Sequence, residues 1–113
     1  MEKKSLQEVR EFGADKLTKR VLFKKGESVA FVLNFAPGQT LPPHNHPGTA
    51  VFLLVVEGAG TITVDGVQTE VALNDAICVD GEEQFAFENT GKEPARLYVV
   101  LSKIPDERYA QNV

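Results

Sequence analysis

The sequence contains one cysteine, Cys78, in 113 residues. An internal disulfide is therefore excluded, which is typical of a protein from a reducing compartment. The chain also lacks a long apolar run, and none approaches the roughly 20 residues of a membrane-spanning helix. Its first residues, Met1 to Ser5, lead into a polar segment and not into the apolar core of a signal peptide. We expect a cytoplasmic protein without a membrane partner, with Cys78 as a buried structural thiol.

Positive charge is scarce in this chain. It has 12 lysines and arginines against 16 aspartates and glutamates, a formal net charge of −4. Nucleic-acid binding depends on clustered basic side chains that neutralise phosphates, so no nucleic-acid partner is expected. One local basic group exists, which we interpret as a solvated strand end and not as an anion site. It comprises Lys16, Lys19, Arg20, Lys24 and Lys25.

Length and composition indicate one domain. An apolar content of 42% and a charged content of 25% are ordinary for a globular chain that buries a core of its own. We expect an N-terminal arm over residues 1–17, a β-barrel over 18–105 and a polar tail over 106–113. In the arm, Ser5 and Glu8 resemble a capping box, so a short helical turn and an irregular arm are both open.

From residue 18 onward the sequence consists of short β-rich runs separated by turn residues. In the run from Ser28 to Ala36, alternate residues are large and apolar, so one face of this strand is expected in a core. That face carries Val29, Phe31, Leu33 and Phe35. Asp65-Gly66 is the strongest hairpin signal. About eight or nine such strands, joined by Gly, Pro, Asn and Asp turns, predict an all-β jelly roll or small barrel.

Two of these strands lead to further predictions about which side chains are covered. The run from Ala50 to Val56 is apolar on both faces, so it must be covered on both sides. A chain this small has little other material to cover the outer face of a barrel, and we therefore predict a homodimer interface here. On the last strand, Ala95 to Ile104, Arg96 and Tyr98 alternate with apolar residues and are expected to point outward.

Both histidines of the chain, His44 and His46, lie between Pro37 and Gly48. In an extended segment, side chains at i and i+2 point to the same face, so the two imidazoles project side by side. Neutral imidazole is the commonest metal ligand, and this pair predicts two corners of a site for a divalent metal such as Zn, Fe, Ni or Mn. The alternative is a pair of hydrogen-bonded loop histidines.

The spacing around these histidines resembles the first motif of the cupin superfamily, G-x5-H-x-H-x4-E-x6-G. Gly38, His44, His46 and Gly58 occupy their motif positions, and Val51 stands where the family usually has glutamate. The flanking strands suit the same barrel, so the chain resembles a small single-domain cupin over nearly all of its length. The resemblance implies a double-stranded β-helix, a jelly-roll barrel in which the histidines face the interior.

The second cupin motif, G-x5-P-x-G-x2-H-x3-N, resembles residues 74–89 in spacing, and only the final asparagine agrees in type. Cupins of the usual pattern hold a divalent metal with three histidines and a glutamate. The resemblance supplies His44 and His46, whereas Val51 and Phe85 cannot bind a metal. Water, substrate oxygens or a polar side chain would complete the site. The nearest candidates in sequence are Gln39, Glu82, Glu83 and Gln84.

Two functions are compatible with these residues. The favoured one is a non-catalytic module that binds a small apolar or amphipathic molecule inside the barrel, with the histidines fixing its orientation. Its predicted ligand pocket is lined by Phe31, Phe35, Val51, Phe85 and Phe87. The alternative is a metal-dependent cupin enzyme of the dioxygenase, isomerase or decarboxylase type, acting on a small oxygen-rich metabolite at His44 and His46. Phenylalanines that simply fill a core stay open as an interpretation.

Overall fold

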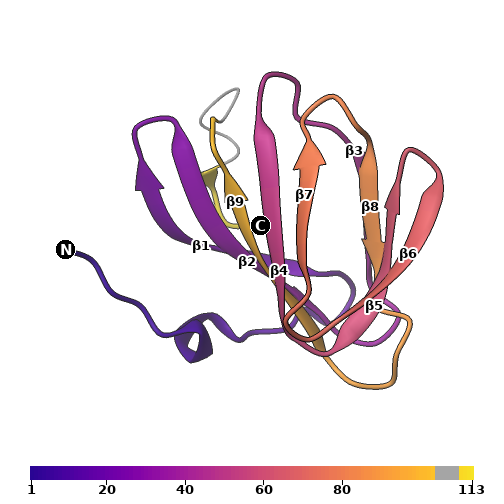
Figure 1. Cartoon of the computed structure of the whole chain (residues 1–113). Coiled ribbons are helices and arrows are strands. Elements are labelled where there is room, and N and C mark those ends of the chain that lie inside the picture. Colours follow the sequence, from indigo (N-terminus) through magenta and orange to yellow (C-terminus); the bar gives the residue numbers. More distant parts are fainter. Residues whose placement is uncertain (104–109) are drawn as a thin grey trace.

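The computed structural model describes residues 1–103 and 110–113 of the chain. The described residues form a short 3₁₀ turn, η1 (Leu6–Val9), and two antiparallel sheets that face each other (Figure 1). The first sheet has the strand order β1-β2-β9-β4-β7 and the second β3-β8-β5-β6, which confirms the prediction of an all-β barrel. The strands are β1 (Thr18–Lys25), β2 (Ser28–Phe35), β3 (Thr40–His44), β4 (Ala50–Glu57), β5 (Ala59–Val64), β6 (Val67–Ala72), β7 (Ala76–Asp80), β8 (Phe85–Glu88) and β9 (Ala95–Leu101).

Residues with a positive φ fix two of the turns. The β5–β6 hairpin turns at Asp65 and Gly66, whose φ angles are 46° and 82°. Two-residue hairpin loops of this type require a left-handed backbone at both central residues, so the predicted hairpin is confirmed. Gly58, with a φ of 74°, lies between β4 and β5, where a Cβ atom would collide with the carbonyl oxygen of Pro94. This close approach explains why the last position of the first motif needs glycine.

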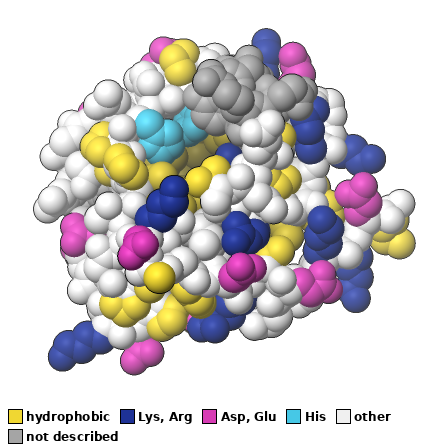
Figure 2. Space-filling model, turned by 180° about the vertical axis from the view of Figure 1, so that it is seen from behind, with side chains coloured by type: hydrophobic (Ala, Val, Ile, Leu, Met, Phe, Trp, Pro, Cys, Tyr) yellow, Lys and Arg dark blue, Asp and Glu magenta, His cyan; other side chains and the backbone are white. Residues whose placement is uncertain are grey.

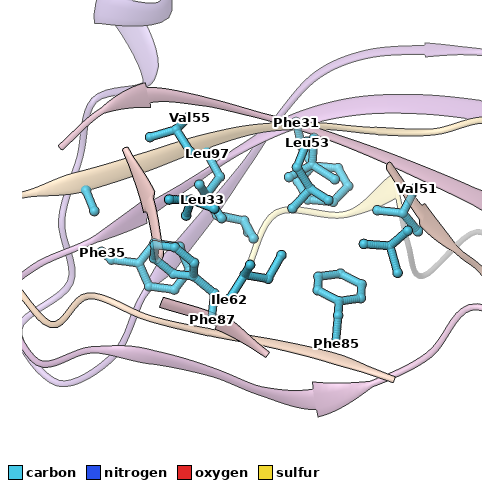
Figure 3. Close-up of a cluster of buried hydrophobic side chains, with 14 of the residues drawn as sticks. Phe31, Leu33, Phe35, Val51, Leu53, Val55, Ile62, Phe85, Phe87 and Leu97 are labelled. Carbon is cyan, nitrogen blue, oxygen red and sulfur yellow. The ribbon is translucent and has the colours of Figure 1, made fainter. Parts of the chain in front are cut away.

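Antiparallel register brings the inward-facing side chains of the first sheet into rows. One row joins Phe31 on β2, Val99 on β9 and Leu53 on β4. These side chains belong to one buried core with Ile62 and Phe87 of the second sheet (Figure 3). The predicted inward face of β2 is confirmed, because all of its members are buried. They are Val29, Phe31, Leu33 and Phe35.

The N-terminal arm lies against the outer face of the first sheet at Asn34 on β2 and Arg96 on β9, and this buried arginine joins the arm to the sheet. The guanidinium of Arg96 donates hydrogen bonds to Asn34 Oδ1 at 2.7 Å and to the Leu6 carbonyl oxygen at 2.6 Å. It also lies 3.7 Å from Glu57 Oε1, and Glu57 accepts two hydrogen bonds from Arg10. We expected Arg96 to lie at the surface. It points away from the barrel interior, but the arm covers it, leaving it 2% exposed with oxygen atoms around its charge.

The outer face of β4 is apolar and exposed. Phe52 and Leu54 are 47% and 38% exposed, whereas the alternate residues of this strand are buried. Cys78 on β7 pairs with Phe52 and shares this outer face. Its thiol is exposed, so the prediction of a buried structural cysteine is wrong. Successive side chains of a strand point to opposite faces, and on β7 the side chain that points into the core is Val79 and not Cys78.

The last described residues lie against β1. The backbones of Val113 and Lys19 exchange two hydrogen bonds, at 3.0 and 3.1 Å, and Asn112 Oδ1 accepts one from the Val21 backbone. The predicted boundary between barrel and tail at residue 105 lies outside the described residues. Within residues 1–103 and 110–113, no helix has the length and apolar character that a membrane crossing requires.

Arg96→Met is expected to lower the free energy of unfolding by roughly 3 kcal/mol, because buried oxygen atoms lose their donor. Arg10→Met is the matched control, since it removes the other partner of Glu57. That ion pair joins side chains that are 35% and 29% exposed, so water screens it and its loss is expected to cost much less than the loss of Arg96. Urea unfolding gives both values, and equal losses would contradict the role of Arg96 in fixing the arm.

Candidate functional site

The two histidines lie next to each other at the edge of the barrel interior. Strand β3 ends at His44, and His46 follows in the loop that leads to β4. Their ring centroids are 4.7 Å apart, with the ring planes at 78°. His44 Nδ1 lies 2.9 Å from the carbonyl oxygen of Pro42. Because a carbonyl oxygen can only accept, Nδ1 carries the proton of this contact, and in the neutral form of the imidazole the lone pair is then on Nε2.

His46 is the more buried of the two, with 4% of its surface exposed. Its backbone N–H donates to the Gly81 carbonyl oxygen at 2.9 Å, and its own carbonyl oxygen accepts from the Thr49 N–H at 3.0 Å. Burial, followed by the charges of His44 and Lys19, lowers the pKa of His46 to about 4. At neutral pH this imidazole is therefore uncharged and offers one donor and one acceptor.

Phe85 occupies the position where the second cupin motif has its third histidine. It pairs with His44 across β3 and β8, and its ring centroid lies 4.6 Å from the His44 ring and 5.9 Å from the His46 ring. Val51, in the glutamate position of the first motif, is buried in the core. An aromatic ring and an aliphatic side chain thus stand in place of two of the four usual ligands.

The other described side chains do not complete a metal site. Within residues 1–103 and 110–113, no group of three His, Cys, Asp or Glu side chains is placed to hold an ion. Glu82 and Glu83 each accept a hydrogen bond from a backbone N–H, and Gln39 donates one to a carbonyl oxygen of the N-terminal arm. Two imidazoles supply about half of a tetrahedral donor set, so these residues do not fit a metal held by side chains alone.

A cavity of about 140 Å³ lies beside the imidazoles. Figure 2 shows the histidine side chains at the rim of a hollow with a hydrophobic floor. Phe31 and Phe85, from the predicted pocket, line it, whereas Phe35 and Phe87 lie elsewhere in the core with ring centroids 4.8 Å apart (Figure 3). Val51 also lies in the core and outside this lining. The described residues that line it are Lys19, Phe31, Leu33, Leu41, His44, His46, Phe85, Val99 and Leu101.

Lys19 is the site residue that sequence reasoning missed. It pairs with Leu33 across β1 and β2, so both side chains face the barrel interior. Its Nζ lies 4.5 Å from the centroid of the Phe31 ring, and burial lowers its pKa. We expected a solvated strand end. A bulge between Val21 and Phe23 interrupts the alternation of β1. The sequence pattern therefore does not show which side chains of this strand face the interior.

The barrel and the two motif histidines agree with a comparison to known families. Residues 31–101 match the family model of the cupin domain. This match spans more than half of the 113 residues, and the chain therefore belongs to the cupin domain family, as its motif spacing predicted.

Relatives with assigned names are distant. The chain is 28% identical over 72 residues to the tetracenomycin polyketide synthase protein TcmJ of Streptomyces glaucescens, which covers 64% of this chain and 48% of that protein. It is 34% identical over 58 residues to the dimethylsulfoniopropionate lyase DddW of Ruegeria pomeroyi, covering 51% of this chain and 38% of the lyase. The chain thus spans about half or less of the length of these curated relatives.

Solved structures agree with the fold over nearly the whole chain. A Thermus thermophilus protein is similar with a TM-score of 0.88 at 24% identity, covering 93% of this chain and all of that one. An uncharacterized conserved protein with a double-stranded β-helix domain from Klebsiella pneumoniae gives 0.87 at 20% identity, covering 100% of this chain and 96% of that one. The predicted double-stranded β-helix in a single domain is therefore confirmed.

Proposed function

We propose that this cupin binds a small apolar or amphipathic molecule in the cavity beside the histidines. The observation that carries the proposal is the lining: among the residues that the structure describes, six apolar side chains surround the polar groups of Lys19, His44 and His46. Ligand sites are typically apolar hollows with a few polar groups that fix orientation. An apolar cavity of about 150 Å³ holds one benzene molecule. A volume of about 140 Å³ therefore suits one ring or a short branched chain.

His46 gives this cavity an uncharged hydrogen-bonding group. His46 is neutral because its pKa is lowered to about 4, so it can either donate to a ligand oxygen or accept from a hydroxyl. The rings of His44 and Phe85 lie 4.6 Å apart and together form one wall of the cavity beside His46. A ligand with an apolar body and one polar end would match both the wall and the polar groups.

A metal-dependent cupin enzyme is the second candidate, and one observation favours it. The contact between His44 Nδ1 and the Pro42 carbonyl oxygen is of the kind that orients metal-bound histidines and leaves Nε2 as the ligand atom. With His46 it would hold two positions of a divalent ion such as Zn, Fe, Ni or Mn, and ligand or water oxygens would take the others. A distant relative is named as a lyase, so enzymes occur among the proteins similar to this chain.

A homodimer formed through the outer face of β4 is part of the same proposal. Phe52 and Leu54 are exposed there, with Tyr98 and Val100 on β9 and Cys78 on β7 paired beside them. None of these side chains is charged at neutral pH, so two copies that each carry a net charge of −4 can meet here without a like-charge contact. A second copy suits the patch because an isologous contact buries the same surface on both chains.

Val99→Phe should fill the cavity and weaken the binding of a single-ring probe, benzyl alcohol, by roughly tenfold or more. Val100→Phe is the matched control, because the neighbouring residue on β9 lies on the opposite face of the sheet. Titration of ¹⁵N-labelled protein by NMR measures both dissociation constants. Equal binding by the two variants, or the absence of binding by the parent protein, would contradict a ligand site in this cavity.

Elemental analysis of protein purified without an affinity tag tests the metal-dependent alternative. We expect less than one metal ion per chain, because two imidazoles leave the donor set incomplete. The comparison is the double variant His44→Ala with His46→Ala. One ion per chain in the parent and none in the double variant would favour the enzyme over the binding module.

Light scattering is expected to give twice the chain mass for the parent protein. Phe52→Lys places a charge at the centre of the outer β4 face and should shift the protein to a monomer. Val67→Lys is the control, since Val67 is an exposed apolar residue on β6, in the other sheet. A monomeric parent protein, or an equal effect of the two substitutions, would rule out this interface.

A further inference from the structure

The barrel is open along one side, where an edge strand of each sheet borders a groove. Strand β1 is the edge of the first sheet and β3 the edge of the second, and among the residues that the structure describes no ladder joins the two. We call this opening the seam, and the groove along it has a volume of about 410 Å³. The described residues that line the groove are Lys16, Leu17, Lys19, Leu33, Thr40, Leu41, Pro42 and Val113.

The groove and the cavity beside the imidazoles are neighbouring hollows. Their linings share Lys19, Leu33 and Leu41. Lys19 and Leu33 belong to the first sheet and Leu41 to the second, so both sides of the seam contribute to both hollows. A molecule in the cavity can therefore extend between the two edge strands into the groove.

The groove is mainly apolar. Leu17, Leu33, Leu41, Pro42 and Val113 supply its apolar surface, and the described part of its lining contains no aspartate or glutamate. Leu17 and Leu41 also pack against the core, whereas Val113 is 59% exposed. Covering such side chains removes apolar surface from water, so the groove favours an apolar occupant.

Hydrogen bonds hold the walls of the groove in place. In the segment that leads into β1, the Gly13 carbonyl oxygen accepts a hydrogen bond from the Gln39 side chain at 2.8 Å. The same side chain accepts one from the Ala36 backbone N–H at 2.8 Å, which fixes its position. Val113 is held through its two backbone hydrogen bonds with Lys19. Because the groove is already formed, a ligand pays little ordering entropy to occupy it.

A peptide suits the seam poorly. A peptide that binds as an added strand needs unpaired backbone N–H and carbonyl groups along an edge. Edge strand β3 contains Pro42 and Pro43, which have no N–H, and Asn112 and Val113 already form hydrogen bonds with β1. An alkyl chain has no polar groups to satisfy, so it can lie over apolar side chains without such partners.

Building on the proposed function of this cavity, we propose that its ligand is an elongated amphipathic molecule with an unbranched alkyl tail. The head, one ring or a short branched chain with a polar end, occupies the cavity beside His44 and His46. The tail passes between the two edge strands and lies in the groove, against Leu17 and Val113. The groove is the larger hollow, about 410 Å³ against about 140 Å³, so it can hold a tail with more carbon atoms than the head.

Benzyl alcohol and 4-butylbenzyl alcohol test this inference, because they share one head and differ only in the tail. Titration by NMR should show 4-butylbenzyl alcohol binding roughly tenfold or more tightly, since each methylene that leaves water strengthens binding about two- to fourfold. The double variant Leu17→Ser with Val113→Ser removes apolar surface from the groove. It should reduce the gain from the tail to less than about threefold and change benzyl alcohol binding by less than about twofold.

Two further variants complete the test. Val67→Ser with Leu73→Ser is the matched control, because it replaces an exposed valine and an exposed leucine that lie outside both linings, and it should keep the full gain. Val113→Ser alone changes an exposed side chain and should lower the gain about twofold, so the test holds even if the Leu17 substitution disturbs folding.

The outcomes separate this inference from the proposed function. If the parent binds both alcohols equally, or if the full gain survives in both groove variants, the tail does not lie in the groove, although the cavity still binds small molecules. An equal loss of the gain in the control variant would also overturn the inference. If the groove variants are monomers in light scattering while the parent is a dimer, the groove is an interface between copies of the chain and not a tail site. If neither alcohol binds, the proposed function itself fails.

Discussion

The antiparallel register of β2, β9 and β4 is the constraint on which the rest of this structure depends. Directly paired residues face the same side of a sheet, so one register fixes all inward-facing side chains together. It aligns Phe31, Val99 and Leu53 in one row of the core. The same pairing, extended to β1, turns Lys19 toward the interior beside Leu33. The first sheet's part of the core and its part of the cavity lining, Lys19, Phe31, Leu33, Val99 and Leu101, are therefore set together, and a slip of one residue would move both to the outside.

Within the cupin pattern, this chain keeps two ligand positions and fills two others with apolar side chains. His44 and His46 lie next to each other, Phe85 lies against the His44 ring, and Val51 is buried in the core. The replacements remove two donors and add apolar surface around the imidazoles. Burial is the largest cause of the lowered pKa of His46, which stays neutral. The imidazoles thus lie among apolar side chains, with fewer donors around them than the usual cupin pattern supplies.

Two regions of the outer surface of the first sheet differ in whether another part of the chain covers them. Over β2 and β9, the N-terminal arm supplies a carbonyl oxygen to Arg96, and Asn34 and Glu57 add oxygen atoms, so a charged side chain is buried with its partners in place. On β4, Phe52 and Leu54 stay exposed. The chain's own arm covers the first region, and a second copy of the chain would cover the other one. The inner face of the same sheet is occupied by the core and the cavity.

The sequence by itself determined the local features: the alternation of β2, the turn at Asp65 and Gly66, the adjacent histidines and the family that their spacing indicates. Each of these depends on residues a few positions apart in the chain. Only the tertiary structure decided whether the side chains of Lys19, Arg96 and Cys78 are buried or exposed, and the expectations from the sequence were wrong for all three. A bulge in β1, the arm across β9 and the exposed outer face of β7 decide the surroundings of these side chains. Their surroundings come from pairing between distant segments, which no local pattern encodes.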